Sequence, residues 1–198
     1  MVERRTRRSA EESRALILES AAGLLVEGGV QAVQVRAVAS LVGITDAGVS
    51  HHFGTRDRLL EALLRHGGRR LRDELAEVLA HWLDQDADVG ALVEALAGFY
   101  REGYAELALS LHDAGWRDGS SGLLDPVVDA LHSRRSAASS KDDTRLAVAA
   151  LHQALALESV YGSTFRRSAG IAADGATDAA GQLRWWTAAI EKMLDDPG

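Results

Sequence analysis

The stretch at residues 35–53, VRAVASLVGITDAGVSHHF, reads as two short helices joined by a tight turn. Its first part has apolar residues at the i, i+3, i+4, i+7 spacing of one helical face: Val35, Val38, Ala39 and Val42. Gly43 follows, where a helix end favours a residue that can adopt positive φ. Thr45 can cap a second helix, because its hydroxyl can accept from an exposed backbone N–H. The stretch therefore predicts a helical corner.

The second helix of this corner has a small, polar outer face. Val49 and Phe53 are one turn apart and are expected to point inward. The outer positions are Thr45, Asp46, Ala47, Gly48, Ser50, His51 and His52. In a DNA-binding helix-turn-helix the second helix enters the major groove, so its outer face must be slim and able to hydrogen-bond. An ordinary helical corner can show the same pattern, and the stretch alone leaves both interpretations open.

The flanking sequence favours the DNA-binding interpretation. Residues 16–29, LILESAAGLLVEGG, have the spacing of an amphipathic helix. They follow the sequence Ser9-Ala10-Glu11-Glu12, which is a capping-box pattern, and they end at Gly28-Gly29. Downstream, residues 53–59 lead into a further amphipathic helix. Three helices, with the corner as the second and third, are the organisation of a helix-turn-helix domain.

Residues 10–64 resemble the DNA-binding domain of the TetR family of bacterial transcriptional regulators. The family pattern at the second helix of the motif is approximately Gly-Val-Ser-Lys-Gly-Thr-Leu-Tyr-His-Tyr-Phe, followed by a short Pro-Ser-Lys-like step. The run here is GITDAGVSHHF at residues 43–53, followed by Gly54-Thr55-Arg56. The remaining two thirds of the chain match the family only in length and helical character.

Two positions depart from the family pattern. Ser50 stands where the family often has a phosphate-contacting Tyr, and Asp46 stands where a basic residue is common. Two roles stay open for Asp46: a first-turn carboxylate that favours the helix N-terminus without touching DNA, or an acceptor for a cytosine amino group.

Two arginines outside the second helix are further candidates for phosphate contact. Arg56 matches the phosphate-binding Lys of the family, and Arg36 opens the first helix of the motif. The predicted DNA-binding residues are therefore Arg36, Thr45, Asp46, Ala47, Gly48, Ser50, His51, His52 and Arg56.

Charge is distributed unevenly along the chain of 198 residues, whose net charge is −7. Residues 1–72 contain 12 Arg and 8 acidic residues, a balance of +4. Residues 73–198 contain 10 basic and 21 acidic residues, a balance of −11. Positive charge thus lies where contact with phosphates is predicted, as expected of a nucleic-acid-binding segment.

Composition excludes several classes of protein. The chain has no cysteine, which excludes disulfides and cysteine-ligated metals. We expect no apolar run of membrane-spanning length from the sequence, and Glu11, Glu12 and Glu19 interrupt any signal-peptide core. We therefore expect a cytoplasmic protein.

The rest of the chain predicts an all-α fold. No strand-like alternation is present, and helical patterns give about nine helices in all. We expect a basic arm at residues 1–8, a three-helix helix-turn-helix domain at 9–66 and a larger helical ligand-binding and dimerisation domain at 67–198. Gly67-Gly68 is expected to interrupt the fourth helix near His66, either as a hinge or as a plain loop.

The resemblance implies a small-molecule pocket in the C-terminal domain. Candidate lining residues are aromatic or polar side chains within apolar helices: Phe99, Tyr100, Tyr104, His112, Trp116, Gln153, Glu158, Tyr161 and Phe165. Packing in the core or exposure at the surface is the alternative for each of them taken singly.

The last two helical segments, residues 144–165 and 176–194, are apolar over most of their circumference. Such helices must be covered on more than one side. The resemblance implies a homodimer in which these helices form a four-helix bundle. The predicted interface residues are Leu151, Leu155, Leu183, Trp186 and Ile190.

No catalytic or cofactor-binding motif is recognisable in the sequence. His51-His52 lacks a third ligand for a metal. We therefore expect no cofactor, no metal and no enzymatic activity. The favoured interpretation is a repressor released from a palindromic DNA operator by a small molecule. An activator or ligand-independent regulator of the same fold, and an all-α enzyme or small-molecule-binding protein, are the alternatives.

Overall fold

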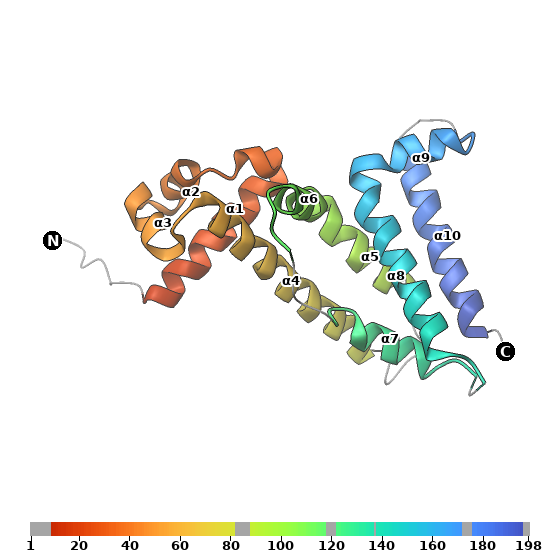
Figure 1. Ribbon diagram of the computed structural model, residues 1–198. Coiled ribbons are helices and arrows are strands. Elements are labelled where there is room, and N and C mark those ends of the chain that lie inside the picture. Colours follow the sequence, from red (N-terminus) through yellow and green to blue (C-terminus); the bar gives the residue numbers. More distant parts are fainter. Residues whose placement is uncertain (1–8, 82–87, 118–121, 137, 172–175, 196–198) are drawn as a thin grey trace. The chain divides into compact units, whose positions relative to one another are not determined.

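The computed structural model describes residues 9–81, 88–117, 122–136, 138–171 and 176–195. All secondary structure within these ranges is helical, which confirms the predicted all-α class. It comprises ten α-helical segments and two π-helical segments (Figure 1). The predicted arm at residues 1–8 lies outside the described residues.

The first helix, α1 (Ala10–Ala32), begins at the predicted capping box. The Glu12 backbone N–H donates to Ser9 Oγ at 3.0 Å, and the Ser9 N–H donates to the Glu12 carboxylate at 2.7 Å. Near its end the helix is kinked at Gly28 and Gly29, where Gly29 has φ 66° and ψ −169°. This backbone conformation is essentially restricted to glycine, which explains the glycine at position 29.

The predicted corner is formed by α2 (Val35–Val42) and α3 (Asp46–Phe53). Gly43 has φ 74° and ends α2 in the left-handed conformation, as its position in the sequence predicts. Thr45 caps α3 and accepts from the Gly48 N–H at 3.1 Å. Val38, Val49 and Phe53 are buried in the core against α1. The helix-turn-helix geometry is therefore present.

The fourth helix, α4 (Arg56–His81), continues through Gly67-Gly68 without interruption. The prediction that it ends near His66 is wrong, because glycine lowers helix stability without forbidding the helix. Leu63 and Leu71, on either side of the pair, are fully buried, so packing keeps this part helical.

Two segments interrupt the later helices with π-helical turns. α5 (Val89–Phe99) continues through η1 (Tyr100–Tyr104) into α6 (Ala105–Asp113), and Gly103 in η1 has φ 89°. α8 (Lys141–Leu157) continues through η2 (Glu158–Gly162) into α9 (Ser163–Ser168). The apolar spacing of residues 144–165 gives no sign of the interruption at 158–162.

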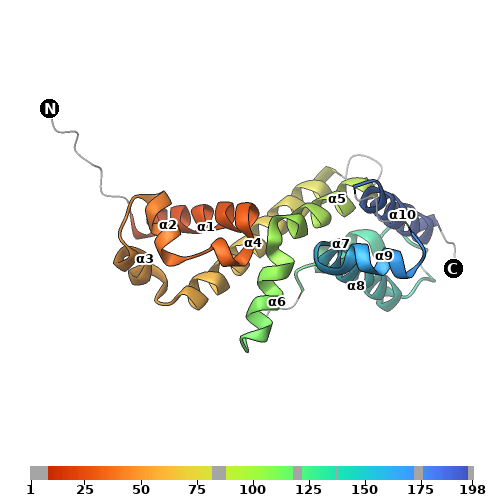
Figure 2. The same ribbon diagram turned by 90° about the horizontal axis from the view of Figure 1, so that it is seen from above.

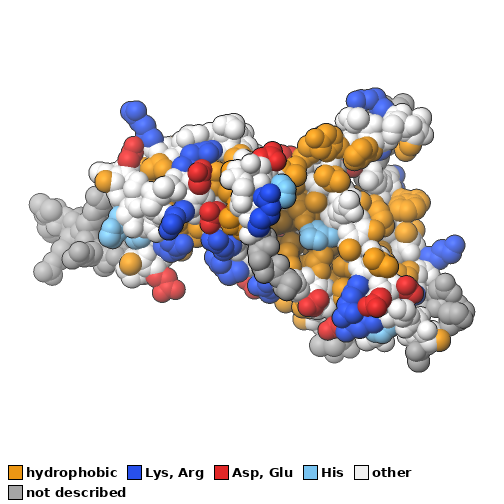
Figure 3. All heavy atoms as spheres, in the orientation of Figure 1, with side chains coloured by type: hydrophobic (Ala, Val, Ile, Leu, Met, Phe, Trp, Pro, Cys, Tyr) orange, Lys and Arg blue, Asp and Glu red, His pale blue; other side chains and the backbone are white. Residues whose placement is uncertain are grey.

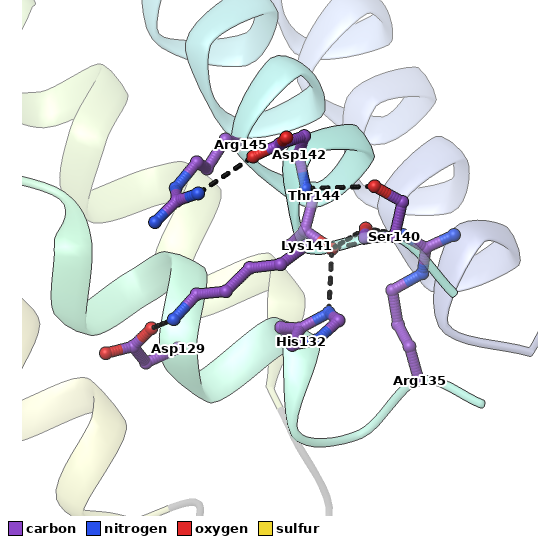
Figure 4. A network of polar contacts seen from close by, with 8 residues as sticks. All are labelled: Asp129, His132, Arg135, Ser140, Lys141, Asp142, Thr144 and Arg145. Carbon is purple, nitrogen blue, oxygen red and sulfur yellow. Dashed lines mark hydrogen bonds and ion pairs between the residues drawn. The ribbon is translucent and has the colours of Figure 1, made fainter. Parts of the chain in front are cut away.

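A polar network joins α7 (Asp125–His132) to the start of α8 (Figure 4). Thr144 is fully buried, and its hydroxyl accepts from Arg135 Nη1 at 3.0 Å. Lys141 pairs with Asp129 at 2.6 Å, and the hydrogen bond from Lys141 lowers the pKa of Asp129. Leu124 is the N-cap residue of α7, and Pro126 lies in its first turn.

The chain forms two compact units. The first contains residues 1–67 and 106–117, and the second contains residues 68–105 and 118–198. In the second unit α5 packs against α8 and against α10 (Ala176–Asp195), as Figures 1 and 2 show. The units differ from the predicted ranges 9–66 and 67–198 in that residues 106–117 group with the first unit.

Among the described helices, α1 is long and apolar enough by length and composition to cross a membrane. This differs from the expectation drawn from the sequence. Ile17, Ala21 and Leu25 of α1 are buried in the core of the first unit, and such a core helix meets the same two criteria.

Candidate nucleic-acid interface and ligand cavity

The outer face of α3 presents the side chains that the sequence predicted. Thr45, Asp46, Ala47, Ser50 and His51 are exposed. Gly48 and His52 are half-buried, and Val49 and Phe53 face the core. The short side chains at 45–50 let the helix backbone approach a partner closely, which a helix in the major groove requires.

Arg14, which the sequence analysis did not single out, holds the C-terminal end of α3. Its Nη1 donates to the His52 carbonyl at 2.9 Å, and its guanidinium carbon lies 4.2 Å from the centre of the Phe53 ring. Arg14 is 38 residues away from His52, so no local pattern could reveal this contact. The contact fixes the end of α3 against the first turns of α1.

Arg56, predicted to contact phosphate, donates two hydrogen bonds within the chain. Its Nε donates to the Val33 carbonyl at 2.8 Å and its Nη2 to the Val30 carbonyl at 2.6 Å. These bonds tie the start of α4 to the segment between α1 and α2. Arg36, on the first turn of α2, is exposed. The predicted contact of Arg36 and Arg56 with phosphate stays a prediction.

Three of the predicted ligand-binding residues meet in the second unit. Phe99 stacks on Tyr104 with ring centres 4.4 Å apart, and Tyr100 contacts Phe99 edge-on. All three are buried. The Tyr100 hydroxyl shares a hydrogen bond with Nε2 of His152, a residue absent from the predicted set. Sequence spacing cannot reveal this pairing, because 52 residues separate the two.

A cavity of about 220 Å³ lies beside this cluster. Tyr100 and Glu158, both predicted, line it together with Ala97, Arg101, Leu155, Ser159, Ala179 and Leu183. Glu158 is paired with Arg166, whose Nη1 also donates to the Gln182 amide oxygen at 3.1 Å. Figure 3 shows hydrophobic side chains gathered over α5 and α8 of this unit. The cavity thus combines apolar walls with few charged groups, as ligand pockets do.

The other predicted ligand-binding residues lie elsewhere. His112 and Trp116 belong to the first unit, so the structure does not group them with the cavity. Gln153 is exposed on α8. Tyr161 and Phe165 are 50% and 56% exposed and contact each other, with ring centres 5.9 Å apart. They belong to an open surface and do not line the cavity.

Burial governs the protonation of the Tyr100–His152 pair. It raises the pKa of the Tyr100 hydroxyl and lowers the pKa of the His152 imidazole, since it penalises the charged form of each. The pair is therefore neutral near pH 7. Within the described residues, no three His, Asp or Glu side chains gather as a metal site would require.

The predicted interface residues fall into two groups. Leu151, Leu155 and Ile190 are 0–2% exposed and pack inside the chain, so they offer almost no area to a partner. Leu183 and Trp186 are half-buried. The exposed apolar side chains of the last helices are instead Leu146, Val160, Tyr161, Phe165 and Trp185. Apolar spacing does not distinguish a helix face covered by the same chain from one covered by a partner, and the predicted interface stays a prediction.

Comparison with known proteins addresses the first unit most directly. Residues 17–63 match the family "Bacterial regulatory proteins, tetR family". The chain is 34% identical over 77 residues to the HTH-type transcriptional repressor KstR2 of Rhodococcus jostii, which is 39% of this chain and 38% of that protein. It is 35% identical over 98 residues to the HTH-type transcriptional repressor Rv3405c of Mycobacterium tuberculosis, 47% of this chain and 51% of that protein. The chain therefore spans about half or less of the length of these relatives.

Solved structures share the fold over most of the chain. A protein assigned to the TetR family from Rhodococcus sp. superposes with a TM-score of 0.55 at 19% identity, over 93% of this chain and 99% of that one. The multidrug binding protein EbrR in complex with ethidium superposes with a TM-score of 0.52 at 20% identity, over 92% of this chain and 98% of that one.

The fold and the matched segment define a class: a helical protein whose N-terminal unit is a helix-turn-helix DNA-binding domain. Within that class the resemblance noted from the sequence is confirmed over residues 17–63, the segment that matches the tetR family.

Proposed function

We propose that this protein is a transcriptional repressor that a small molecule releases from a palindromic operator. The observation that carries the proposal is the exposed, small and polar face of α3, held at its C-terminal end by Arg14. The uneven charge supports it, since the balance is +4 over residues 1–72. The repressors KstR2 and Rv3405c resemble this part of the chain. Such a protein acts in the cytoplasm, where the DNA is.

Small-molecule control is the second part of the proposal. Its support is the cavity of about 220 Å³ in the second unit and the fold shared with EbrR, whose structure contains ethidium. A ligand releases the repressor only if it binds the DNA-free form more tightly than the DNA-bound form. Operator DNA must then weaken ligand binding by the same factor.

α4 supplies a physical link for this control. Its Arg70 forms an ion pair with Glu102 of η1 and lies over the Tyr104 ring, with its guanidinium carbon 5.8 Å from the ring centre. η1 also contributes Tyr100 and Arg101 to the cavity wall. The same helix α4 begins at Arg56, which is bonded to the carbonyls of residues 30 and 33. Movement of η1 on ligand binding therefore acts directly on α4.

A homodimer is the third part, because a palindromic operator requires two copies of α3. Its support is the set of exposed apolar side chains on η2, α9 and α10, such as Val160, Phe165 and Trp185. Several large apolar side chains exposed on neighbouring helices mark an interaction surface. In this proposal Trp185 replaces Trp186 as the interface tryptophan.

Fluorescence anisotropy with labelled duplexes tests the proposal. The duplexes are the DNA upstream of the protein's own gene and a shuffled sequence of equal length, each measured at several salt concentrations. We expect at least about 1,000-fold tighter binding to the operator fragment, with affinity falling as salt rises. Equal affinity for both duplexes would contradict sequence-specific regulation.

A further inference from the structure

We propose that the cavity beside η1 and η2 binds a compact protonated amine with an apolar body, and that Glu158 is its anchor. The inference deepens the proposed function, since it assigns a chemical class to the ligand of that site. It rests on where the π-helical turns lie, on the hydrogen-bonding state of the Glu158 carboxylate and on the pairing of the other charged groups at the wall.

Both π-helical segments border the same cavity. η1 contributes Tyr100 and Arg101, and η2 contributes Glu158 and Ser159. The two segments also contact each other. A π turn interrupts the regular i to i−4 hydrogen bonds of a helix and occurs frequently at functional sites. Because two π turns border this one cavity, we take the cavity as the candidate ligand site of the second unit.

Glu158 has one carboxylate oxygen bound and one without a partner. Oε1 accepts from Arg166 Nη1. Oε2 is buried and has no hydrogen-bond partner among the described residues. A buried carboxylate oxygen without a donor is unfavourable, and such a group calls for an explanation. The last torsion of a glutamate side chain is soft, so the carboxylate can turn Oε2 toward a donor in the cavity at small cost.

The other charged groups at this wall already have partners. Arg101 is paired with Glu94, and Arg166 is shared between Glu158 and Gln182. The Tyr100 hydroxyl is bonded to His152. Among the described lining side chains, Glu158 Oε2 is the buried polar atom without a partner. A protonated amine is a charged hydrogen-bond donor, and its charge strengthens the bond to the carboxylate. An anion would be repelled by the same carboxylate.

The rest of the wall sets the size and character of the ligand. Ala97, Leu155 and Leu183 are apolar, and the Tyr100 ring can lie against a cation. A volume of about 220 Å³ admits a compact molecule and excludes large ones. The ligand is thus an amine carrying one ring or a short branched chain.

Isothermal titration calorimetry on the full-length, DNA-free protein tests this assignment. The probes are 2-phenylethylamine, 2-phenylethanol and 3-phenylpropanoate, which share a body and differ in the charge of the head. We expect the amine to bind most tightly and the anion most weakly. Replacing the carboxylate in Glu158→Gln should weaken the amine about 10- to 100-fold and leave the alcohol nearly unchanged. Glu191→Gln, in the neighbouring groove between α5 and α10, is the matched control and should leave all three probes unchanged.

A second variant covers the case in which Glu158→Gln disturbs the Arg166 pair. A Cβ at position 162 would overlap the Glu158 carboxylate, so Gly162→Ala displaces that group while keeping its charge. We expect the same loss of preference for the amine. Equal binding of amine and anion by the wild type, or an unchanged preference in both variants, would overturn the assignment. Absence of binding by all three probes would overturn it too. Operator binding measured without ligand is independent of these outcomes, so either proposal can fail alone.

Discussion

The two compact units hold their functional side chains in different ways. In the first, α3 is capped by Thr45 at its start and held by Arg14 at its end, and Arg56 is bonded to two carbonyls. In the second, the helices around the cavity are interrupted by π turns, and the Glu158 carboxylate is only partly satisfied. The difference indicates that α3 is held in place within its own unit, whereas the helices around the cavity are less regular.

The largest effect is expected on the stability of the first unit, where long-range hydrogen bonds hold the helices in place. Arg56→Ala removes two charge-assisted hydrogen bonds from half-buried backbone carbonyls, and we expect it to lower the free energy of unfolding by about 3 kcal/mol. Urea denaturation measures the change. Arg58→Ala, an exposed arginine two residues away, is the control and should change stability by less than about 0.5 kcal/mol. Equal effects of the two variants would show that the carbonyl contacts contribute little.

The next effect concerns the exposed apolar surface of the second unit. Trp185 is 62% exposed, and Trp185→Glu should weaken a dimer by at least about 2 kcal/mol, because a charge replaces a large aromatic contact. Sedimentation velocity at several concentrations measures the shift toward monomer. Leu109→Glu, on an exposed apolar residue of α6, is the control and should not alter the association state. A wild-type protein that is monomeric at micromolar concentration would contradict the proposed dimer interface.

Two helical glycines, one at a kink and one in a regular helix, should respond to substitution in opposite directions. Gly29 has positive φ, so Gly29→Ala should destabilise the first unit by about 1–2 kcal/mol. Gly68 lies inside α4 with open space around its Cβ position, so Gly68→Ala should stabilise the helix by about 1 kcal/mol. Thermal melts of both variants give the comparison. A loss of stability in Gly68→Ala would mean that the second glycine pair leaves helical geometry in solution.

The smallest effect is a dependence of stability on pH in the second unit. Burial lowers the pKa of His152 in the folded protein, so the unfolded chain binds the proton more readily. Stability from this group is present above about pH 6.5, the ordinary value for histidine, and is lost as the pH falls below it. His152→Gln should flatten the fall in Tm between about pH 7 and pH 5. The same slope in wild type and variant would assign the dependence to other groups.

The sequence predicted helix ends most accurately, because a helix cap depends on one or two neighbouring residues. Gly43, Thr45 and the capping box at Ser9 and Glu12 occupy the roles that their spacing indicated. The predicted interruption at Gly67-Gly68 was wrong because it rested on the low helix propensity of glycine. The buried leucines on either side of the pair keep the segment helical. A pattern of apolar residues does not separate an α turn from a π turn, so η1 and η2 went unpredicted.

The candidate site was predictable only in part, for a related reason. Tyr100 and Glu158 were identified because aromatic and charged residues within apolar helices are rare enough to notice. Their partners His152 and Arg166 were not, since the pairings depend on how helices pack. Arg56 matched a family position, but its contacts with the carbonyls at positions 30 and 33 are long-range and invisible to a motif.

Gly162 gives the cavity a simple evolutionary property. Because any Cβ at this position overlaps the Glu158 carboxylate, one methyl group added to the backbone would move the anchor without changing its chemistry. A single nucleotide change converts a glycine codon to an alanine codon. Under the proposed function, a lineage could therefore exchange one class of ligand for another in one mutational step, while the proposed DNA-contacting helix α3 stays the same.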